Sequence, residues 1–138
     1  GIDKHLTLAF LDYDGTDMII SGQHEEVIVV RANGALERIE TMDLGLPIGL
    51  DCDISPFVAT RKLKLEKGDV IVLHTDGVTE AENAAGQLFG IERLWDEAVR
   101  LHGETADRIA AGIIDKLMDY IGPHKVHDDI TLLVLRHR

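Results

Sequence analysis

Two acidic segments of the chain contain residue types suited to binding a metal ion. In the first, Leu73 to Glu80, an apolar run delivers Asp76 into a turn, where its carboxylate can face a ligand instead of a core. In the second, Asp128 and Asp129 open the last apolar run of the chain. Two adjacent like charges resist joint burial unless a cation is present. Together the two segments predict an acidic metal site, provided that Asp76 lies near the acidic pair.

Each segment also has a simpler interpretation. Asp76-Gly77 is a common pair in primed hairpin turns, and such a turn predicts an alternating strand directly afterwards. The residues from Val78 to Gly86 are too polar and too rich in alanine to pair well as that strand. The pair Asp128-Asp129, taken alone, is more simply explained as solvated charge before a strand. The metal hypothesis therefore depends on the two segments converging in space.

A competing acidic motif lies near the start of the chain. Phe10 to Thr16 matches the short motif with which haloacid-dehalogenase-like phosphatases begin, which makes Asp12 a candidate nucleophile and Asp14 a candidate acid/base. Those enzymes continue with the helices of a parallel α/β sheet, whereas this chain continues from Asp17 as short strands. We therefore interpret Asp14-Gly15 as a hairpin turn.

The histidines and the cysteine give weaker signals. The seven histidines are scattered and show no spacing of the zinc-binding type. Cys52 is the only cysteine, which excludes an intrachain disulfide and fits a reducing compartment. It stands between Asp51 and Asp53, whose charges disfavour the thiolate, so it is a poor candidate nucleophile.

Composition limits the possible partners. With 138 residues and 45% hydrophobic content, the chain can fill the core of one domain. A formal net charge of −11, from 25 Asp plus Glu against 14 Lys plus Arg, repels nucleic acid and anionic lipid surfaces. No apolar stretch approaches the roughly 20 residues that cross a bilayer, and the first residues do not resemble a signal peptide. We expect a soluble cytoplasmic protein without nucleic-acid or membrane partners.

The hydrophobic pattern predicts the elements that must position these residues. Short alternating or β-branched runs predict antiparallel strands, and Asn33-Gly34 favours a primed two-residue turn between two of them. Apolar residues at helical spacing later predict an amphipathic helix pair before a final strand. This order predicts an α+β fold in a single unit, residues 1–138. The strands are predicted over Thr7–Leu11, Met18–Ser21, Glu26–Arg31, Ala35–Ile39, Phe57–Leu65, Asp69–Thr75 and Ile130–Leu135, and the helices over Ile91–Leu101 and Ile109–Ile121.

Six short motifs occur in order along most of the chain. They are Ser21-Gly22-Gln23-His24, Gly45–Leu50, Lys67-Gly68-Asp69, Thr75–Glu80, Phe89–Leu94 and Asp128–Thr131. No single motif is decisive, but the ordered set resembles the SpoIIE-type phosphatases. These are bacterial serine/threonine phosphatases of the protein phosphatase 2C superfamily that act in sigma-factor partner switching.

The resemblance implies an antiparallel β-sandwich flanked by a helix pair, with the chain as the C-terminal part of an incomplete domain. It implies that two manganese or magnesium ions lie at one end of the sandwich. Asp76 and Asp128 would be metal ligands, with Asp129 as a substitute for Asp128, and the loop Thr79 to Asn83 would border the site. Oxygen ligands suit these hard cations, and water activated by the metal would hydrolyse the phosphoserine or phosphothreonine of an anti-anti-sigma-like protein.

The resemblance also has one clear departure. Family members carry an earlier Asp-Val-x-Gly-His-Gly-like stretch, whose aspartate bridges the two metal ions, followed by a helix pair; nothing before Thr7 supplies either. We therefore expect weak metal binding and little activity from this chain alone. We also expect an uncovered apolar face that favours a homodimer or a close partner. A non-catalytic, partner-binding derivative and a haloacid-dehalogenase-like phosphatase using Asp12 remain as alternatives.

Overall fold

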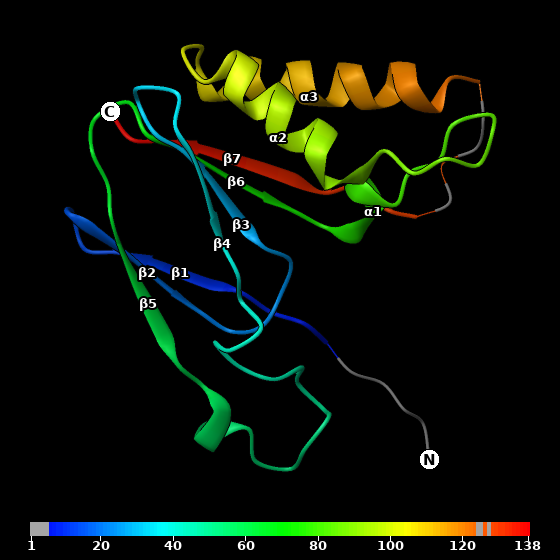
Figure 1. The fold of residues 1–138 in the computed structure, drawn as a ribbon. Helices are drawn as coiled ribbons and strands as arrows, with labels where there is room; N and C mark the ends of the chain where they lie inside the picture. The colour runs from blue at the N-terminus through cyan, green and yellow to red at the C-terminus, as the bar shows by residue number, and fades with distance from the viewer. Residues whose placement is uncertain (1–5, 124–125, 127) are drawn as a thin grey trace. The chain divides into compact units, whose positions relative to one another are not determined.

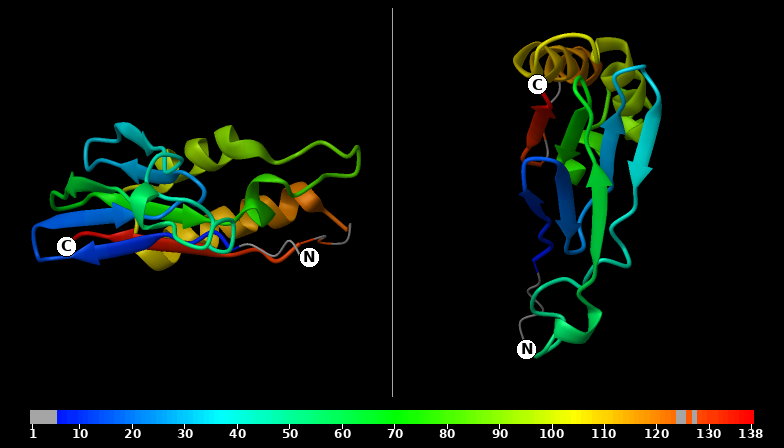
Figure 2. Two further views of the ribbon diagram at one scale, coloured as in Figure 1. Left: turned by 90° about the horizontal axis from the view of Figure 1, so that it is seen from below. Right: turned by 90° about the vertical axis from the view of Figure 1, so that its left-hand side faces the viewer.

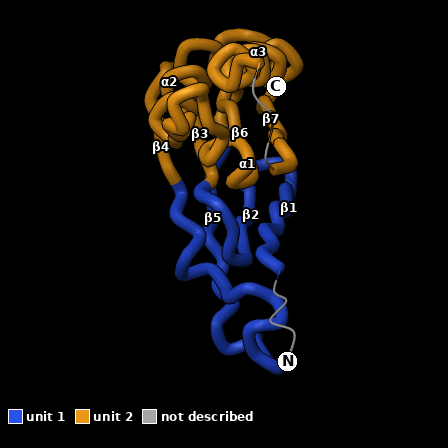
Figure 3. The backbone as a smooth tube through the Cα atoms, turned by 90° about the vertical axis from the view of Figure 1, so that its right-hand side faces the viewer, with its two compact units in different colours: residues 1–26, 39–65 blue, residues 27–38, 66–138 orange. Residues whose placement is uncertain are grey.

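The computed structural model describes residues 6–123, 126 and 128–138. The chain divides into two units, each containing one β-sheet (Figure 3). Unit 1 comprises residues 1–26 and 39–65, and unit 2 comprises residues 27–38 and 66–138. Two antiparallel sheets with a helix pair before the last strand confirm the predicted α+β class. A single domain over residues 1–138 stays a prediction.

Unit 1 contains a three-stranded sheet with the order β1-β2-β5. Its strands are β1 (Phe10–Tyr13), β2 (Asp17–Ser21) and β5 (Thr60–Lys64), coloured from blue to green in Figure 1. Strand β2 is central and pairs antiparallel with both neighbours. Alternate residues of β2, Met18 and Ile20, are buried, as expected for a strand with one core-facing side.

Asp14 forms the turn between β1 and β2. Its Oδ1 accepts the N–H of Thr16 at 2.9 Å and the N–H of Asp17 at 2.8 Å. The hydrogen bonds from Asp17 and Thr16 hold the pKa of Asp14 below its ordinary value. The predicted hairpin turn is confirmed. Asp12 lies exposed in this antiparallel hairpin, so the haloacid-dehalogenase-like alternative, which requires a parallel α/β sheet, is wrong.

Unit 1 carries a set of exposed large apolar side chains. They lie on β1, on the segment before it and on the loop that precedes β5, which includes the short 3-10 helix η1 (Ser55–Phe57). The homodimer expected from an uncovered apolar face stays a prediction. The side chains are Leu6, Leu8, Phe10, Tyr13, Met42, Ile48, Leu50, Phe57 and Val58.

Unit 2 contains a four-stranded sheet with the order β4-β3-β6-β7. Its strands are β3 (Val27–Val30), β4 (Leu36–Ile39), β6 (Val70–His74) and β7 (Leu132–Arg136). Strand β6 pairs antiparallel with both β3 and β7. Every residue of β3 is buried, which agrees with its continuous run of β-branched residues.

Two amphipathic helices, α2 (Gly90–Leu101) and α3 (Ala106–Ile121), lie side by side across one face of this sheet (Figures 1 and 2). Both predicted helices are confirmed. Helix α3 begins earlier than the predicted Ile109, because the Thr105 hydroxyl caps it by accepting the N–H of Arg108 at 3.3 Å. Among the described residues, no helix is long and apolar enough to span a bilayer.

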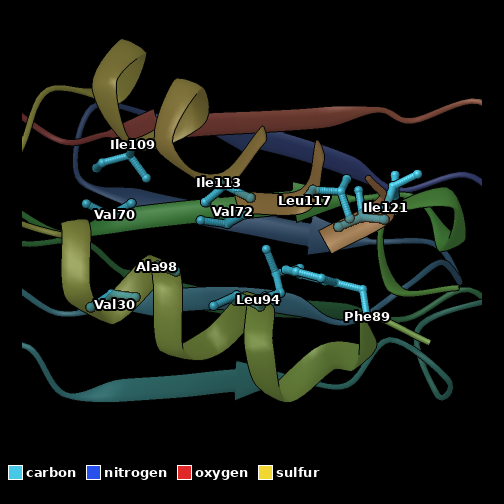
Figure 4. Close-up of a cluster of buried hydrophobic side chains, with 12 residues drawn as sticks. Val30, Val70, Val72, Phe89, Leu94, Ala98, Ile109, Ile113, Leu117 and Ile121 are labelled. Atoms are coloured by element: carbon cyan, nitrogen blue, oxygen red, sulfur yellow. The ribbon is translucent and has the colours of Figure 1, made fainter. Parts of the chain in front are cut away.

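The helices pack onto the sheet through one buried apolar cluster (Figure 4). Side chains from α2 and α3 meet those of β3 and β6, and fully burying each large aliphatic side chain stabilises the fold by roughly 1.5–3 kcal/mol. The cluster includes Val78, from the turn that follows β6, so the same core holds that turn in place. Its members are Ile28, Val30, Val70, Val72, Val78, Phe89, Leu94, Ala98, Ile109, Ile113, Leu117 and Ile121.

The connection between β3 and β4 differs from the predicted primed turn. Arg31 accepts the N–H of Gly34 and donates its own N–H to Ala35, both at 2.8 Å. Gly34 has a φ of 86°, whereas Asn33 does not have a positive φ. A primed Asn-Gly turn requires positive φ at both residues, so that prediction is wrong. The Asn33 Oδ1 instead accepts the N–H of Ala35 at 2.9 Å and favours a three-residue loop.

Asp69 is a buried polar anchor at the start of β6. Its carboxylate accepts hydrogen bonds from Arg31 Nη1 at 2.7 Å, from the N–H of Ala32 at 3.0 Å and from the N–H of Glu66 at 2.9 Å. Burial alone raises the pKa of this carboxyl, but the bonds from Glu66, Arg31 and Ala32 together hold it below its ordinary value of 3.8. The ionised form of Asp69 therefore stabilises the folded state.

We expect the stability of the protein to depend on Asp69 in acid. A carboxyl whose pKa is lower in the folded state contributes stability above its unfolded pKa and loses that contribution as the pH falls through the folded value. Asp69→Asn should lower the free energy of unfolding by about 2 kcal/mol at neutral pH. It should also flatten the decline of stability below about pH 4. Urea denaturation at pH 7 and pH 3 measures both effects, and the same pH dependence in both proteins would contradict the expectation.

Candidate metal site and adjoining pocket

Asp76 begins a one-turn helix directly after β6. This helix, α1 (Asp76–Thr79), follows the extended residue Thr75, and the carbonyl of Asp76 accepts the N–H of Glu80 at 2.8 Å. The alternative prediction of a primed hairpin turn at Asp76-Gly77 is therefore wrong. The Asp76 side chain is exposed at the helix N-terminus, where the helix dipole favours a negative charge.

The segment that precedes β7 runs beside this turn. Thr75 donates its N–H to the carbonyl of Thr131 at 3.1 Å, and Thr131 donates its N–H to the Thr75 hydroxyl at 3.2 Å. These bonds continue the β6–β7 pairing toward Asp76. Two segments that are 56 positions apart in the chain therefore converge at the end of the sheet where β6 ends and β7 begins.

Gly77 sets how closely the two segments approach. A Cβ atom at this position would lie 2.0 Å from the carbonyl oxygen of Asp129 and 2.9 Å from its carbonyl carbon. Real Cβ atoms do not make such contacts with backbone, so this position requires glycine for lack of space. The bare backbone of Gly77 brings the Asp76 turn against the acidic pair.

Asp128 and Asp129 are both exposed beside this contact. The Asp128 Oδ1 accepts the N–H of Asp129 at 2.7 Å, and Asp128 lines the same cavity as Gly77. In the part of the chain that the structure describes, neither Asp76 nor Asp128 forms an ion pair. The two predicted segments lie together, while the assignment of Asp76, Asp128 and the substitute Asp129 as metal ligands stays a prediction.

The donor atoms fit a hard cation in kind but are few in number. Carboxylate oxygens are the ligands that manganese and magnesium prefer in proteins. Over residues 6–123, 126 and 128–138, no group of three or more His, Cys, Asp or Glu side chains is arranged to hold a metal ion. Asp76 and Asp128 therefore fit part of a metal site, which a further ligand would have to complete.

A cavity of about 410 Å³ adjoins the Asp76 turn. One part of its lining is apolar and another part is acidic, and the residues that form it come from α1, the following loop, the end of α3 and the segment before β7. The sequence identified Asp128 as a candidate ligand, and the resemblance placed the loop that contains Glu80 and Glu82 at the border of the site without giving either glutamate a role. The lining residues are Gly77, Glu80, Ala81, Glu82, Leu88, Ile121, Val126 and Asp128.

Two helical side chains hold the loop wall of this cavity, residues 81–88. The Tyr120 hydroxyl donates to the carbonyl of Leu88 at 3.0 Å, and Arg93 Nη1 donates to the carbonyl of Phe89 at 2.7 Å. The Arg93 guanidinium also lies 4.8 Å from the centre of the Tyr120 ring. The sequence pattern assigned Tyr120 only to an apolar helix face and gave Arg93 no role beyond its place in the Phe89–Leu94 motif. Hydrogen bonds to backbone carbonyls cannot be recognised from residue spacing.

Asn83 closes the tip of the same loop. Its Oδ1 accepts the N–H of Ala85 at 3.0 Å and the N–H of Gln87 at 2.9 Å, and its Nδ2 donates to the Gln87 side chain at 3.0 Å. A local hydrogen-bond hub of this kind restrains a polar loop that has few apolar contacts. The cavity wall is therefore fixed at its tip by Asn83 and at its end by α2 and α3.

Sequence comparison identifies related proteins. Residues 3–138 match the family model described as Stage II sporulation protein E (SpoIIE). The phosphoserine phosphatase RsbU of Bacillus subtilis (strain 168) is 35% identical over 102 residues, which covers 72% of this chain and 28% of RsbU. Protein IcfG of Synechocystis sp. is 27% identical over 122 residues, or 88% of this chain and 18% of IcfG. The chain thus spans less than a third of either relative.

Solved structures share the fold at low sequence identity. The SiaA-PP2C domain of Pseudomonas aeruginosa has a TM-score of 0.74 at 23% identity, covering 88% of this chain and 47% of that one. The Mn-presoaked phosphatase domain of SpoIIE from Bacillus subtilis has a TM-score of 0.67 at 14% identity, covering 97% and 56%. These structures show that the fold is of the protein phosphatase 2C type. Because the family model also matches nearly the whole chain, the protein belongs to the SpoIIE family.

Proposed function

We propose that this chain forms part of a metal-dependent phosphatase that removes phosphate from phosphoserine or phosphothreonine in sigma-factor partner switching. The convergence of the Asp76 and Asp128 segments beside one cavity, in a member of the SpoIIE family, is the main observation in support. The relative RsbU is named as a phosphoserine phosphatase. The substrate would be a phosphorylated anti-anti-sigma-like protein, as the family resemblance implies, and the reaction would take place in the cytoplasm.

Asp76 and Asp128 would hold Mn²⁺ or Mg²⁺ through carboxylate oxygens. Manganese soaking of the related SpoIIE phosphatase domain supports this choice of cation. When bound, such an ion lowers the pKa of a coordinated water and neutralises phosphoryl oxygens. The contact of Gly77 with Asp129 and the paired bonds between Thr75 and Thr131 hold the two ligands on a fixed backbone.

The charge of the site also favours a metal requirement. Five exposed carboxylates surround the turn and the cavity, and together they repel a phosphate dianion. Without a cation, these carboxylates would repel the phosphate of the substrate. Phosphate binding would therefore depend on the metal ion that the same residues bind. The carboxylates belong to Asp76, Glu80, Glu82, Asp128 and Asp129.

The direct test is hydrolysis of p-nitrophenyl phosphate and of a phosphoserine peptide by this chain, with manganese, with magnesium and with EDTA. We expect hydrolysis only with a metal and at a low rate, because Asp76 and Asp128 form a partial site. Manganese binding, followed by the loss of the free-ion paramagnetic resonance signal, provides a readout that does not depend on turnover. Hydrolysis that persists in EDTA, or the absence of both manganese binding and turnover, would argue against the proposal.

A non-catalytic, partner-binding protein is the second candidate. It is favoured by the absence of any group of three or more potential metal-ligating side chains within the described residues. A pseudophosphatase of this kind would bind the anti-anti-sigma-like protein without hydrolysis, and the Asp76→Asn variant would bind it equally well. Comparing the affinities of the parent protein and of Asp76→Asn for the anti-anti-sigma-like protein therefore separates the two candidates.

A further inference from the structure

We propose that the cavity of about 410 Å³ beside Asp76 and Asp128 is a specificity pocket for the substrate. It would take an apolar side chain together with an adjacent basic side chain, both a few residues from the phosphorylated residue. This inference rests on the proposed phosphatase function and adds to it the chemical class of the substrate segment. Metal binding and hydrolysis would not need this pocket, so the pocket is a separate feature of the proposed site.

The apolar part of the pocket can hold an aliphatic or aromatic side chain. Ala81, Leu88 and Ile121 line it, and the Leu88 side chain, on the loop wall, is 50% exposed. A pocket of a few hundred Å³ with an apolar lining is a typical site for burying a ligand side chain. Covering Leu88 with an apolar group would remove this exposed surface from water, which favours binding.

The acidic part of the pocket selects for positive charge. Glu80 and Glu82 are exposed, and within the described residues neither carboxylate takes part in a hydrogen bond or an ion pair. Available carboxylates at the edge of a pocket attract a lysine or arginine and repel an acidic residue. Charge complementarity therefore identifies the occupant as a basic segment.

The two parts of the pocket are direct neighbours. Glu82 and Leu88 form an isolated antiparallel bridge, and Phe89 donates its N–H to the carbonyl of Ala81 at 2.7 Å. Residues directly opposite in such a pair have their side chains on the same face, roughly 5 Å apart. An acidic and an apolar group at this spacing match adjacent basic and apolar groups on one ligand segment.

The pocket is also pre-formed and continuous with the candidate metal site. Tyr120, Arg93 and Asn83 fix its loop wall through the hydrogen bonds described above. Pre-organised walls lower the entropic cost of binding. Gly77 and Asp128 belong to the same lining, so a segment seated in the pocket lies beside the place where the phosphate would be held. The occupant and the phosphorylated residue would then belong to one short stretch of the substrate.

The test compares three fluorescent phosphoserine peptides that bind to this chain in the presence of manganese. The first carries leucine and arginine a few residues from the phosphoserine, the second has glutamate in place of arginine, and the third has serine in place of leucine. We expect the first to bind about tenfold more tightly than the second, and several-fold more tightly than the third. Fluorescence anisotropy measures the three dissociation constants.

Two variants assign these preferences to the pocket. Glu80→Gln combined with Glu82→Gln should reduce the preference for arginine over glutamate to about twofold or less, while the preference for leucine remains. Leu88→Ser should reduce the preference for leucine, while the preference for arginine remains. Glu40→Gln removes an exposed carboxylate in unit 1 and is the matched control that should keep both preferences. Because each readout is a ratio of affinities within one variant, a modest loss of stability does not imitate the expected result.

The outcomes separate this inference from the proposed function. Equal affinities for the three phosphorylated peptides would overturn the pocket assignment. If each peptide bound equally well with and without its phosphate, the role of the pocket in substrate selection would be overturned. Manganese-dependent hydrolysis of p-nitrophenyl phosphate, which has no flanking residues, tests the phosphatase function independently of the pocket. Phosphate-dependent discrimination among peptides without any hydrolysis would support the pocket and count against the enzyme.

Discussion

Replacement of Asp76 by asparagine should reduce manganese-dependent hydrolysis of p-nitrophenyl phosphate at least about a hundredfold, because the proposed loss of a ligand would weaken binding of the ion, whose stabilisation of transition-state charge is worth several kcal/mol. The variant should also lose manganese binding. Its stability should change little, since the Asp76 side chain is exposed. Steady-state kinetics, titration with manganese and urea denaturation measure these three quantities.

Asp119→Asn is the matched control for this substitution. It makes the same chemical change at an exposed position of α3 and should retain both activity and metal binding. Asp128→Asn should resemble Asp76→Asn, whereas Asp129→Asn should have a smaller effect if Asp128 is the second ligand. Normal manganese binding by Asp76→Asn would remove this residue from the metal site.

Replacement of Gly77 by alanine should lower the free energy of unfolding by about 3 kcal/mol or more, because overpacking against rigid backbone is costly. The added Cβ would meet the Asp129 carbonyl oxygen at 2.0 Å, so the two segments must move apart. The bond from the Thr131 N–H to the Thr75 hydroxyl should then weaken, and the Thr131 amide should exchange faster with solvent. Urea denaturation and hydrogen exchange measure the two effects.

Gly103→Ala provides the control for this experiment. No neighbouring atom lies within 4 Å of a Cβ at Gly103, so its stability should stay within about 0.5 kcal/mol of the parent protein. If Gly77→Ala behaved in the same way, the close approach of the two segments would not be a property of the protein in solution. Loss of manganese binding in Gly77→Ala alone would instead connect this approach to the site.

The sequence predicted the elements whose periodicity is strong and whose ends have clear signals. The helices α2 and α3 follow their apolar spacing, and the Asp14 side chain forms the predicted turn. The first strand was expected at Thr7–Leu11 but is observed at Phe10–Tyr13. The bounds of β1 follow its pairing with β2, which the turn at Asp14 sets. The register of such a pair depends on turn geometry, which a short apolar run does not reveal.

The two primed-turn interpretations failed for different physical reasons. Residue type predicted a primed turn at Asn33-Gly34 and left one open as the alternative at Asp76-Gly77. At the first, the Asn33 side chain bonds to the Ala35 N–H and favours a longer loop. At the second, the Asp129 carbonyl takes the space beside Gly77, which gives the glycine a tertiary role instead of a local one. Residue type alone does not distinguish these uses of glycine.

The candidate site was predictable only in part. Asp76 and Asp128 could be identified because each stands where an apolar run meets a polar segment, and the family resemblance gave them a role. The pairing of Glu82 with Leu88 was missed because it depends on the path of the loop between α1 and α2. Tyr120 was predicted to be on an apolar helix face, yet its hydroxyl bonds to a backbone carbonyl that no sequence pattern reveals.

The placement of Asp76 at the end of β6 and of Asp128 before β7 makes the carboxylate arrangement sensitive to how these neighbouring strands align, with His74 opposite Leu132. A slip by one residue would turn every side chain of one strand to the opposite face and would shift one aspartate relative to the other. Chains trapped in such a misaligned form during folding could not capture the cation. Under the proposed function, manganese affinity would therefore report whether the two strands are correctly aligned.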